Sequence, residues 1–348
     1  MNNYENYLII LFYTFFINFF FVKFDLFKDK KKAFKHKNFT QDKSTPPFTG
    51  GIIFFLTLII FIPNIYYELK IFFLIIFLIG FFSDLNVLKS PNLRFFIQLI
   101  VVLLFVIFSN IFVESVRINI IDQLLENYAF KLLFTSFCIL ILINGSNFID
   151  GVNTLAIGYY LLVLLFISTI FLELNFKNSS LNINILYYLL FSLGSLFVLN
   201  LFNKLYLGDN GAYLVSVFVG VSLIYIAKNN IIISPYYILN LLWYPAYENL
   251  FSIIRKAKNS KSAFKPDNFH LHQLIFTFLK YKIKNFKIIN SFTGCIINFF
   301  NFIIFFLATI NYSSTKYQLL ITCFSLIVYN FLYLILKNYL KKKEVVIK

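Results

Sequence analysis

Eleven long apolar runs restrict the fold of this chain more than any other feature. A helix needs about 20 consecutive apolar residues to cross a bilayer, whereas membrane β-strands are about half as long and alternate in polarity. With 59% hydrophobic residues, a soluble fold is excluded. The sequence predicts an all-α, polytopic membrane protein of about eleven spans, or ten if a short second or third run does not cross. The runs cover residues 7–24, 50–66, 69–83, 95–113, 129–144, 155–174, 184–202, 211–227, 231–247, 288–311 and 317–337.

Basic residues are distributed unevenly between the predicted loops. Of the 31 Lys and Arg residues, six fall on one side and the other 25 on the opposite side. Because cytoplasmic loops carry the excess of Lys and Arg, we expect the N-terminus outside and the C-terminus in the cytoplasm. The net charge of +16 then serves orientation and contact with anionic lipid, rather than nucleic-acid binding. The predicted cytoplasmic loops are 25–49, 84–94, 145–154, 203–210 and 248–287.

Three aspartates lie where apolar runs meet predicted cytoplasmic loops. They are Asp84 in GFFSDLNVLKSP, Asp150 in NGSNFIDGVNTLAIG and Asp209 in LYLGDNGA. Each alone is also typical of a helix cap or a turn, because Gly, Asn and Ser flank it. Three carboxylates at one membrane depth, however, suit Mg²⁺, which prefers oxygen ligands and can bind a diphosphate. We therefore expect the three acids to share a site.

Two of the cytoplasmic loops add cations and imidazoles. The last loop contains Arg255, His270 and His272, and the first contains Lys43 followed by Thr-Pro-Pro and a Gly pair. The loop with Lys43 can bring a cation and backbone N–H groups to a phosphate. The alternatives are a polar loop at the lipid headgroups for the histidines and a simple turn into the next helix for the first segment.

Five segments resemble, in order, the motifs of the polyprenyl-phosphate N-acetylhexosamine-1-phosphate transferases of glycosyltransferase family 4. That superfamily includes phospho-MurNAc-pentapeptide translocase, and the resemblance is closest to the branch that transfers GlcNAc 1-phosphate to undecaprenyl phosphate. No motif is decisive alone, but all five lie on the predicted cytoplasmic face. The segments are KSTPPFTGG, GFFSDLNVLKSPNLRFFIQ, NGSNFIDGVNTLAIG, YLGDNGA and PAYENLF together with PDNFHLHQL.

The resemblance implies one transmembrane catalytic domain over residues 1–348 in the bacterial cytoplasmic membrane, with the active site on the cytoplasmic face. Such enzymes transfer a sugar 1-phosphate, here expected to be an N-acetylhexosamine, from a UDP-sugar to undecaprenyl or another polyprenyl phosphate. UMP is released, and a cell-envelope glycan such as O-antigen or a peptidoglycan-type polymer is started. The expected cofactor is Mg²⁺, with Mn²⁺ as a substitute. Membrane lipid is a further partner, and a homodimer is left open.

The resemblance also assigns roles to individual residues. It implies that Asp209 and Asp150 hold the metal and that Asp84 orients or activates the lipid phosphate, so that all three are catalytic. Tyr206 matches an aromatic residue that stacks on uracil, although a tyrosine at the lipid interface is the alternative. The substrate-binding residues implied are Lys43, Asn147, Asn153, Tyr206, Arg255, His270 and His272.

Three positions depart from the motifs of the family. Ser83 replaces the first acid of an Asp-Asp pair, Asn153 replaces an aspartate and Ala212 replaces a serine. These departures leave an inactive scaffold relative as one alternative. A transporter of lipid-linked sugars is another, but it would need charges near the bilayer midplane. The acids of this chain lie at helix ends instead, which favours the enzyme.

Overall fold

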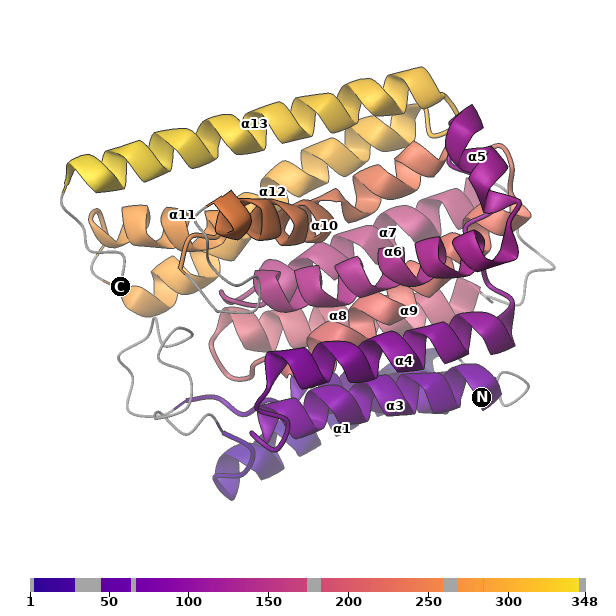
Figure 1. The fold of residues 1–348 in the computed structure, drawn as a ribbon. Helices are drawn as coiled ribbons and strands as arrows, with labels where there is room; N and C mark the ends of the chain where they lie inside the picture. The colour runs from indigo at the N-terminus through magenta and orange to yellow at the C-terminus, as the bar shows by residue number, and fades with distance from the viewer. Residues whose placement is uncertain are drawn as a thin grey trace.

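The computed structural model describes residues 3–28, 45–63, 67–173, 183–258, 268–283 and 285–343, and these residues form thirteen α-helices without a strand (Figure 1). Eleven of the described helices coincide with the predicted apolar runs, and α5 and α11 are short additions. The helices are α1 (Asn3–Lys23), α2 (Gly50–Phe61), α3 (Tyr67–Asp84), α4 (Pro91–Ser109), α5 (Asn119–Leu125), α6 (Tyr128–Ile149), α7 (Leu155–Glu173), α8 (Ile183–Leu201), α9 (Gly208–Asn229), α10 (Pro235–Lys258), α11 (Leu271–Lys280), α12 (Phe286–Ile310) and α13 (Thr315–Lys342).

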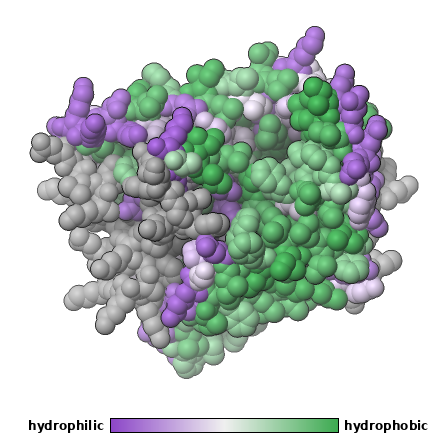
Figure 2. Space-filling model, in the orientation of Figure 1, coloured by the Kyte–Doolittle hydropathy of each residue, from purple (hydrophilic) through white to green (hydrophobic). Residues whose placement is uncertain are grey.

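The surface and the helix lengths fit a polytopic membrane protein. Among the described residues, seven helices are long and apolar enough to cross a membrane: α1, α4, α6, α8, α9, α12 and α13. Figure 2 shows a broad apolar surface between hydrophilic ends. The predicted all-helical membrane class is confirmed, whereas the number of crossings and their orientation stay predictions. In Figure 1, α1 begins at one end of the bundle and α13 ends at the other, as an odd number of crossings requires.

Helix α9 forms the centre of the bundle, where it packs against α2, α3 and α6. Two glycines allow the first turn of α9 to approach its neighbours closely. A Cβ atom at Gly80 of α3 would lie 2.4 Å from the Cα of Asn210, and one at Gly51 of α2 would lie 2.3 Å from the nitrogen of Gly211. Only glycine permits such approach of two backbones. This packing brings the end of α3 against the start of α9.

Helices extend into four of the segments predicted to be loops, and the structure corrects those boundaries. In α6, polar residues ended the apolar pattern but do not end the helix, because their side chains bond to the backbone of the preceding turn. In α6, Ser146 Oγ donates to Leu142 O at 2.6 Å and Asn144 Nδ2 donates to Leu140 O at 2.9 Å. The corrected segments are 84–94, where α3 ends at Asp84 and α4 begins at Pro91; 145–154, which α6 enters as far as Ile149; 203–210, where α9 begins at Gly208; and 248–287, which contains the end of α10, all of α11 and the start of α12.

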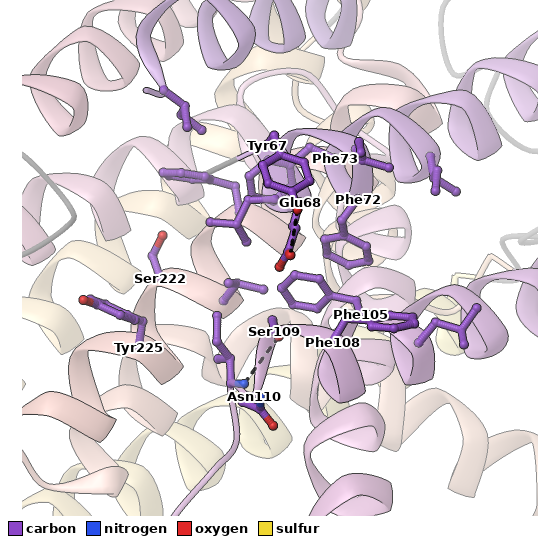
Figure 3. A pocket seen from close by; sticks show the side chains of 18 of the residues that line it. Tyr67, Glu68, Phe72, Phe73, Phe105, Phe108, Ser109, Asn110, Ser222 and Tyr225 are labelled. Atoms are coloured by element: carbon purple, nitrogen blue, oxygen red, sulfur yellow. Dashed lines mark hydrogen bonds between the residues drawn. The ribbon is translucent and has the colours of Figure 1, made fainter. Parts of the chain in front are cut away.

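A cavity of about 780 Å³ lies between α3, α4 and α9, and the three predicted aspartates do not line it (Figure 3). The rings of Phe72 and Phe105 line it with their centroids 3.8 Å apart. Lys228, which also lines it, is at the end of α9 opposite Asp209. None of the predicted site residues that the structure describes lines this cavity. The acids therefore belong to a different part of the molecule.

Candidate active site

Asp84, the last residue of α3, caps the start of α9. Its Oδ1 accepts a hydrogen bond from the backbone N–H of Asp209 at 2.9 Å, and its Oδ2 accepts one from Asn210 at 3.0 Å. Gly208 has a φ of +78°, and a Cβ there would lie 2.8 Å from Asp84 Oδ2. A carboxylate is favourable at a helix N-terminus, where N–H groups lack partners within the helix. Two of the predicted acids are therefore joined directly, and Asp84 orients the turn that carries Asp209.

Asp209 is buried, with 4% of its surface exposed, and three side chains from three helices surround its carboxylate. Ser83 Oγ donates to Oδ2 at 2.6 Å, Arg94 Nη1 donates to the same oxygen at 2.8 Å, and Asn147 Nδ2 donates to Oδ1 at 2.6 Å. Charge-assisted hydrogen bonds of this kind are the strong ones in proteins. Asp209 is thus the point at which α3, α4, α6 and α9 meet.

Arg94 was not among the residues assigned to the site from the sequence, although it lies within the second motif. Ser90 caps α4 and accepts from the N–H of Leu93 at 3.4 Å, which places Arg94 in the first turn of α4. The signal that could have identified Arg94 is its charge at the start of an apolar span, at the same membrane face as the acids. Its ion pair with Asp209 joins α4 to α9.

Ser83, the first departure from the family motif, bridges Arg94 and Asp209. Its hydroxyl accepts a hydrogen bond from Arg94 Nη1 while donating to Asp209. A hydroxyl can do both, whereas an ionised carboxylate can only accept. A second carboxylate at this position would place like charges side by side near one guanidinium. The structure thus accommodates Ser83 as a bridge between the cation and the carboxylate.

The first and fourth motifs are paired through their backbones. Tyr206 N donates to Pro47 O at 2.9 Å, and Gly50 N donates to Tyr206 O at 3.1 Å. The half-buried Tyr206 ring has its centroid 5.9 Å from that of Phe48. This pairing places the Thr-Pro-Pro segment beside Asp209, as expected if both serve one site. Lys43, the predicted cation of this segment, lies outside the described residues.

The end of α6 connects the acids to the histidines. Asn147 bonds to Asp209, and the ring of the next residue, Phe148, has its centroid 5.0 Å from that of His270. A Cβ at Gly151 would lie 2.4 Å from Nε2 of His272. Residues 147–151 therefore contact both Asp209 and the His-x-His turn, which lie far from them in sequence.

The His-x-His turn is held by a buried acid that the sequence-based site did not include. Glu248 of α10 is 1% exposed, and its Oε2 accepts from His270 Nδ1 at 2.8 Å. His272 is fully buried, and burial lowers its pKa to about 3. Neither of its ring nitrogens has a hydrogen-bond partner among the described residues. His272 therefore supplies a neutral imidazole at physiological pH, not a positive charge.

The remaining predicted residues are less closely joined to Asp209. Asn153 Nδ2 donates to Asn203 Oδ1 at 3.1 Å, so this departure from the family motif binds a neighbouring turn. Asp150 is half-buried at the C-terminal cap of α6. The Arg255 guanidinium lies 5.6 Å from the Phe269 ring centroid, beside the His-x-His turn. Among the described residues, no group of three or more His, Cys, Asp or Glu side chains is arranged to hold a metal.

Gly151→Ala should lower turnover of this site by roughly 10- to 100-fold, the range for residues that orient a functional group. The added methyl group would overlap His272 and displace its ring. Gly194→Ala is the matched control, since a Cβ there meets nothing within 4 Å. Transfer assays on both variants at equal expression check this. Equal activity of the two variants would show that the position of His272 is unimportant.

Comparisons with known proteins agree with this geometry. Residues 67–227 match the model of glycosyl transferase family 4. The chain is also 25% identical over 235 residues to the undecaprenyl-phosphate alpha-N-acetylglucosaminyl 1-phosphate transferase of Thermotoga maritima, a match covering 68% of this chain and 69% of the relative. The resemblance found in the motifs is confirmed. The segment that matches glycosyl transferase family 4, residues 67–227, contains Asp84, Arg94, Asn147 and Asp209.

Proposed function

We propose that this protein transfers a sugar 1-phosphate from a UDP-sugar to a polyprenyl phosphate such as undecaprenyl phosphate. The observation that carries the proposal is the buried network of Asp84, Arg94 and Asp209 at one end of a membrane-protein bundle, beside a His-x-His turn. Cations and fixed donors at a membrane face suit a reaction between a lipid phosphate and a soluble diphosphate. The relative's name supports the lipid acceptor.

In the proposed reaction, an oxygen of the lipid phosphate attacks the β-phosphorus of the UDP-sugar and UMP leaves. Catalysis of phosphoryl transfer is mostly positioning and charge stabilisation. Arg94 provides a fixed positive charge for a phosphate, and Asp84 holds the first turn of α9 in place. Tyr206 is suited to stack on the base, and His270 and His272 provide imidazoles for the phosphate or the sugar. Lys43 and Arg255 are proposed to add positive charge.

The donor set fits Mg²⁺, with Mn²⁺ as a substitute. Mg²⁺ is usually held by one or two carboxylates, with water and substrate phosphates as its remaining ligands, so three protein acids are not required. We propose Asp209 and Asp150 as the protein ligands. When bound, the ion would neutralise charge on the diphosphate.

The proposed location is the cytoplasmic membrane of a bacterium, with the active site on the cytoplasmic face. The uneven distribution of Lys and Arg supports this orientation, because loops rich in these residues stay inside. UDP-sugars are then supplied from the cytoplasm and the lipid phosphate from the bilayer. The product would be the first lipid-linked sugar of a cell-envelope glycan.

A transfer assay in oriented vesicles tests chemistry and orientation together. Inside-out and right-side-out vesicles containing the protein are given polyprenyl phosphate, Mg²⁺ and one of several radiolabelled UDP-sugars. We expect label in the lipid fraction only from inside-out vesicles, with UDP-N-acetylhexosamines the best donors. Transfer confined to right-side-out vesicles would refute the orientation. No transfer to lipid with any donor, by folded protein in detergent, would favour the inactive scaffold.

A further inference from the structure

Glu248 connects α10 to the His-x-His turn through two hydrogen bonds and accepts a third from its own helix. Its Oε2 lies 2.8 Å from His270 Nδ1, while its Oε1 accepts from Leu271 N at 3.0 Å and from the Tyr244 hydroxyl at 3.3 Å. Only 1% of Glu248 is exposed. Because the bond to Leu271 occupies the first N–H group of α11, the carboxylate also fixes where that helix begins.

The contact with Glu248 restricts the state of the His270 ring. An ionised carboxylate only accepts hydrogen bonds, so the proton of a neutral His270 must be on Nδ1. The ring also has neighbours that restrict its rotation. The Phe148 centroid is 5.0 Å away, and the His272 ring is nearly parallel at 5.6 Å, with an angle of 15°. The hydrogen bond to Glu248 and these two rings together hold the imidazole of His270 in one orientation.

We propose that Glu248 is a positioning residue, which keeps the proton of His270 on Nδ1 and holds its imidazole in one orientation for the substrate. This inference rests on the proposed function. Glu248 acts through His270, because its own oxygens are engaged by groups of α10 and α11. The imidazole held in this way would contact a phosphate oxygen or a sugar hydroxyl of the UDP-sugar.

Glu248→Gln separates orientation of the ring from capping of the helix. The amide oxygen can still accept from Leu271, but the NH₂ group then faces Nδ1 and favours the opposite tautomer of His270. We expect kcat to fall by about 10- to 100-fold, as for groups that orient a functional histidine, with KM nearly unchanged. Glu114→Gln is the matched control, because Glu114 pairs with Lys131 on the surface far from the site.

The same substitution in a His270→Ala background gives the decisive result. If Glu248 acts through His270, Glu248→Gln should cause no further loss there. An equal loss in both backgrounds would show a purely structural role and overturn the inference. Glu248→Asp keeps the charge and should recover part of the lost turnover. If the Gln variant does not fold, Glu248→Asp is measured in both backgrounds instead, with the same two outcomes.

Failure of the inference and of the proposed function can be told apart. If the wild-type protein transfers sugar phosphate but the losses from Glu248→Gln and His270→Ala simply add, the proposed function stands and the role of Glu248 is refuted. Folded wild-type protein that transfers nothing, with any UDP-sugar tested, refutes the proposed function and the inference with it.

Discussion

Asp209→Asn is expected to reduce sugar-phosphate transfer by at least about a hundredfold, the loss typical of removing a main electrostatic group from an active site. The amide keeps the shape of the side chain but removes the charge that faces Arg94 and, in the proposed reaction, the metal. Turnover measured at several Mg²⁺ concentrations checks this. Near-normal turnover at limiting Mg²⁺ would show that Asp209 only completes a structural network.

Two further variants give this prediction its controls. Asp150→Asn should cause a comparable loss, and the double variant should be little worse than either single one, because both acids would act through one ion. Asp122→Asn is the matched control. Asp122 lies in α5, where it accepts from Ser115 and from the N–H of Val116 and has no part in the proposed site, so its loss should leave turnover within about threefold.

Arg94→Ala is expected to abolish most transfer and to destabilise the protein as well. It removes a fixed positive charge from the site and leaves the carboxylate of Asp209, with 4% of its surface exposed, without its cation. Breaking a buried ion pair by removing one partner costs about 3–5 kcal/mol. Thermal unfolding in detergent and the transfer assay measure the two effects separately. Lys89→Ala is the matched control. Lys89 is an exposed cation in the connection between α3 and α4, and its loss should change neither stability nor transfer.

A double variant tests whether the loss of stability comes from the unpaired charge. When Asp209→Asn is added to Arg94→Ala, no buried carboxylate lacks its cation, so part of the stability should return while activity stays low. If the double variant is less stable than Arg94→Ala, the destabilisation has another cause. In that case the packing of the long arginine side chain against α9 would be the better explanation.

Sequence patterns could predict the acids of the candidate site but not their partners. Asp84 and Asp209 stood out because a charge beside an apolar span is costly and therefore needs a reason. Their direct contact, with Asp84 capping the helix that carries Asp209, depends on Gly51 and Gly80 allowing α2 and α3 to approach α9. Arg94 and Glu248 were present in the quoted motifs, but nothing in their local sequence shows which side chains they meet.

The sequence by itself determined the class of fold and its membrane character. Apolar runs of membrane-spanning length leave the backbone no alternative to helices, because backbone groups in lipid must bond within their own segment. Local polarity does not predict where the helices end, however, and α6 and α10 continue past the predicted boundaries.

Only the tertiary structure decided which polar groups share a site. The pairs Arg94–Asp209, Asn147–Asp209 and Glu248–His270 join different helices, so their contacts depend on how the helices pack, and helix periodicity does not specify that packing. The same packing buries His272 and keeps its imidazole neutral. Burial and long-range pairing are properties of the assembled bundle, and they set the charges that the site presents to a substrate.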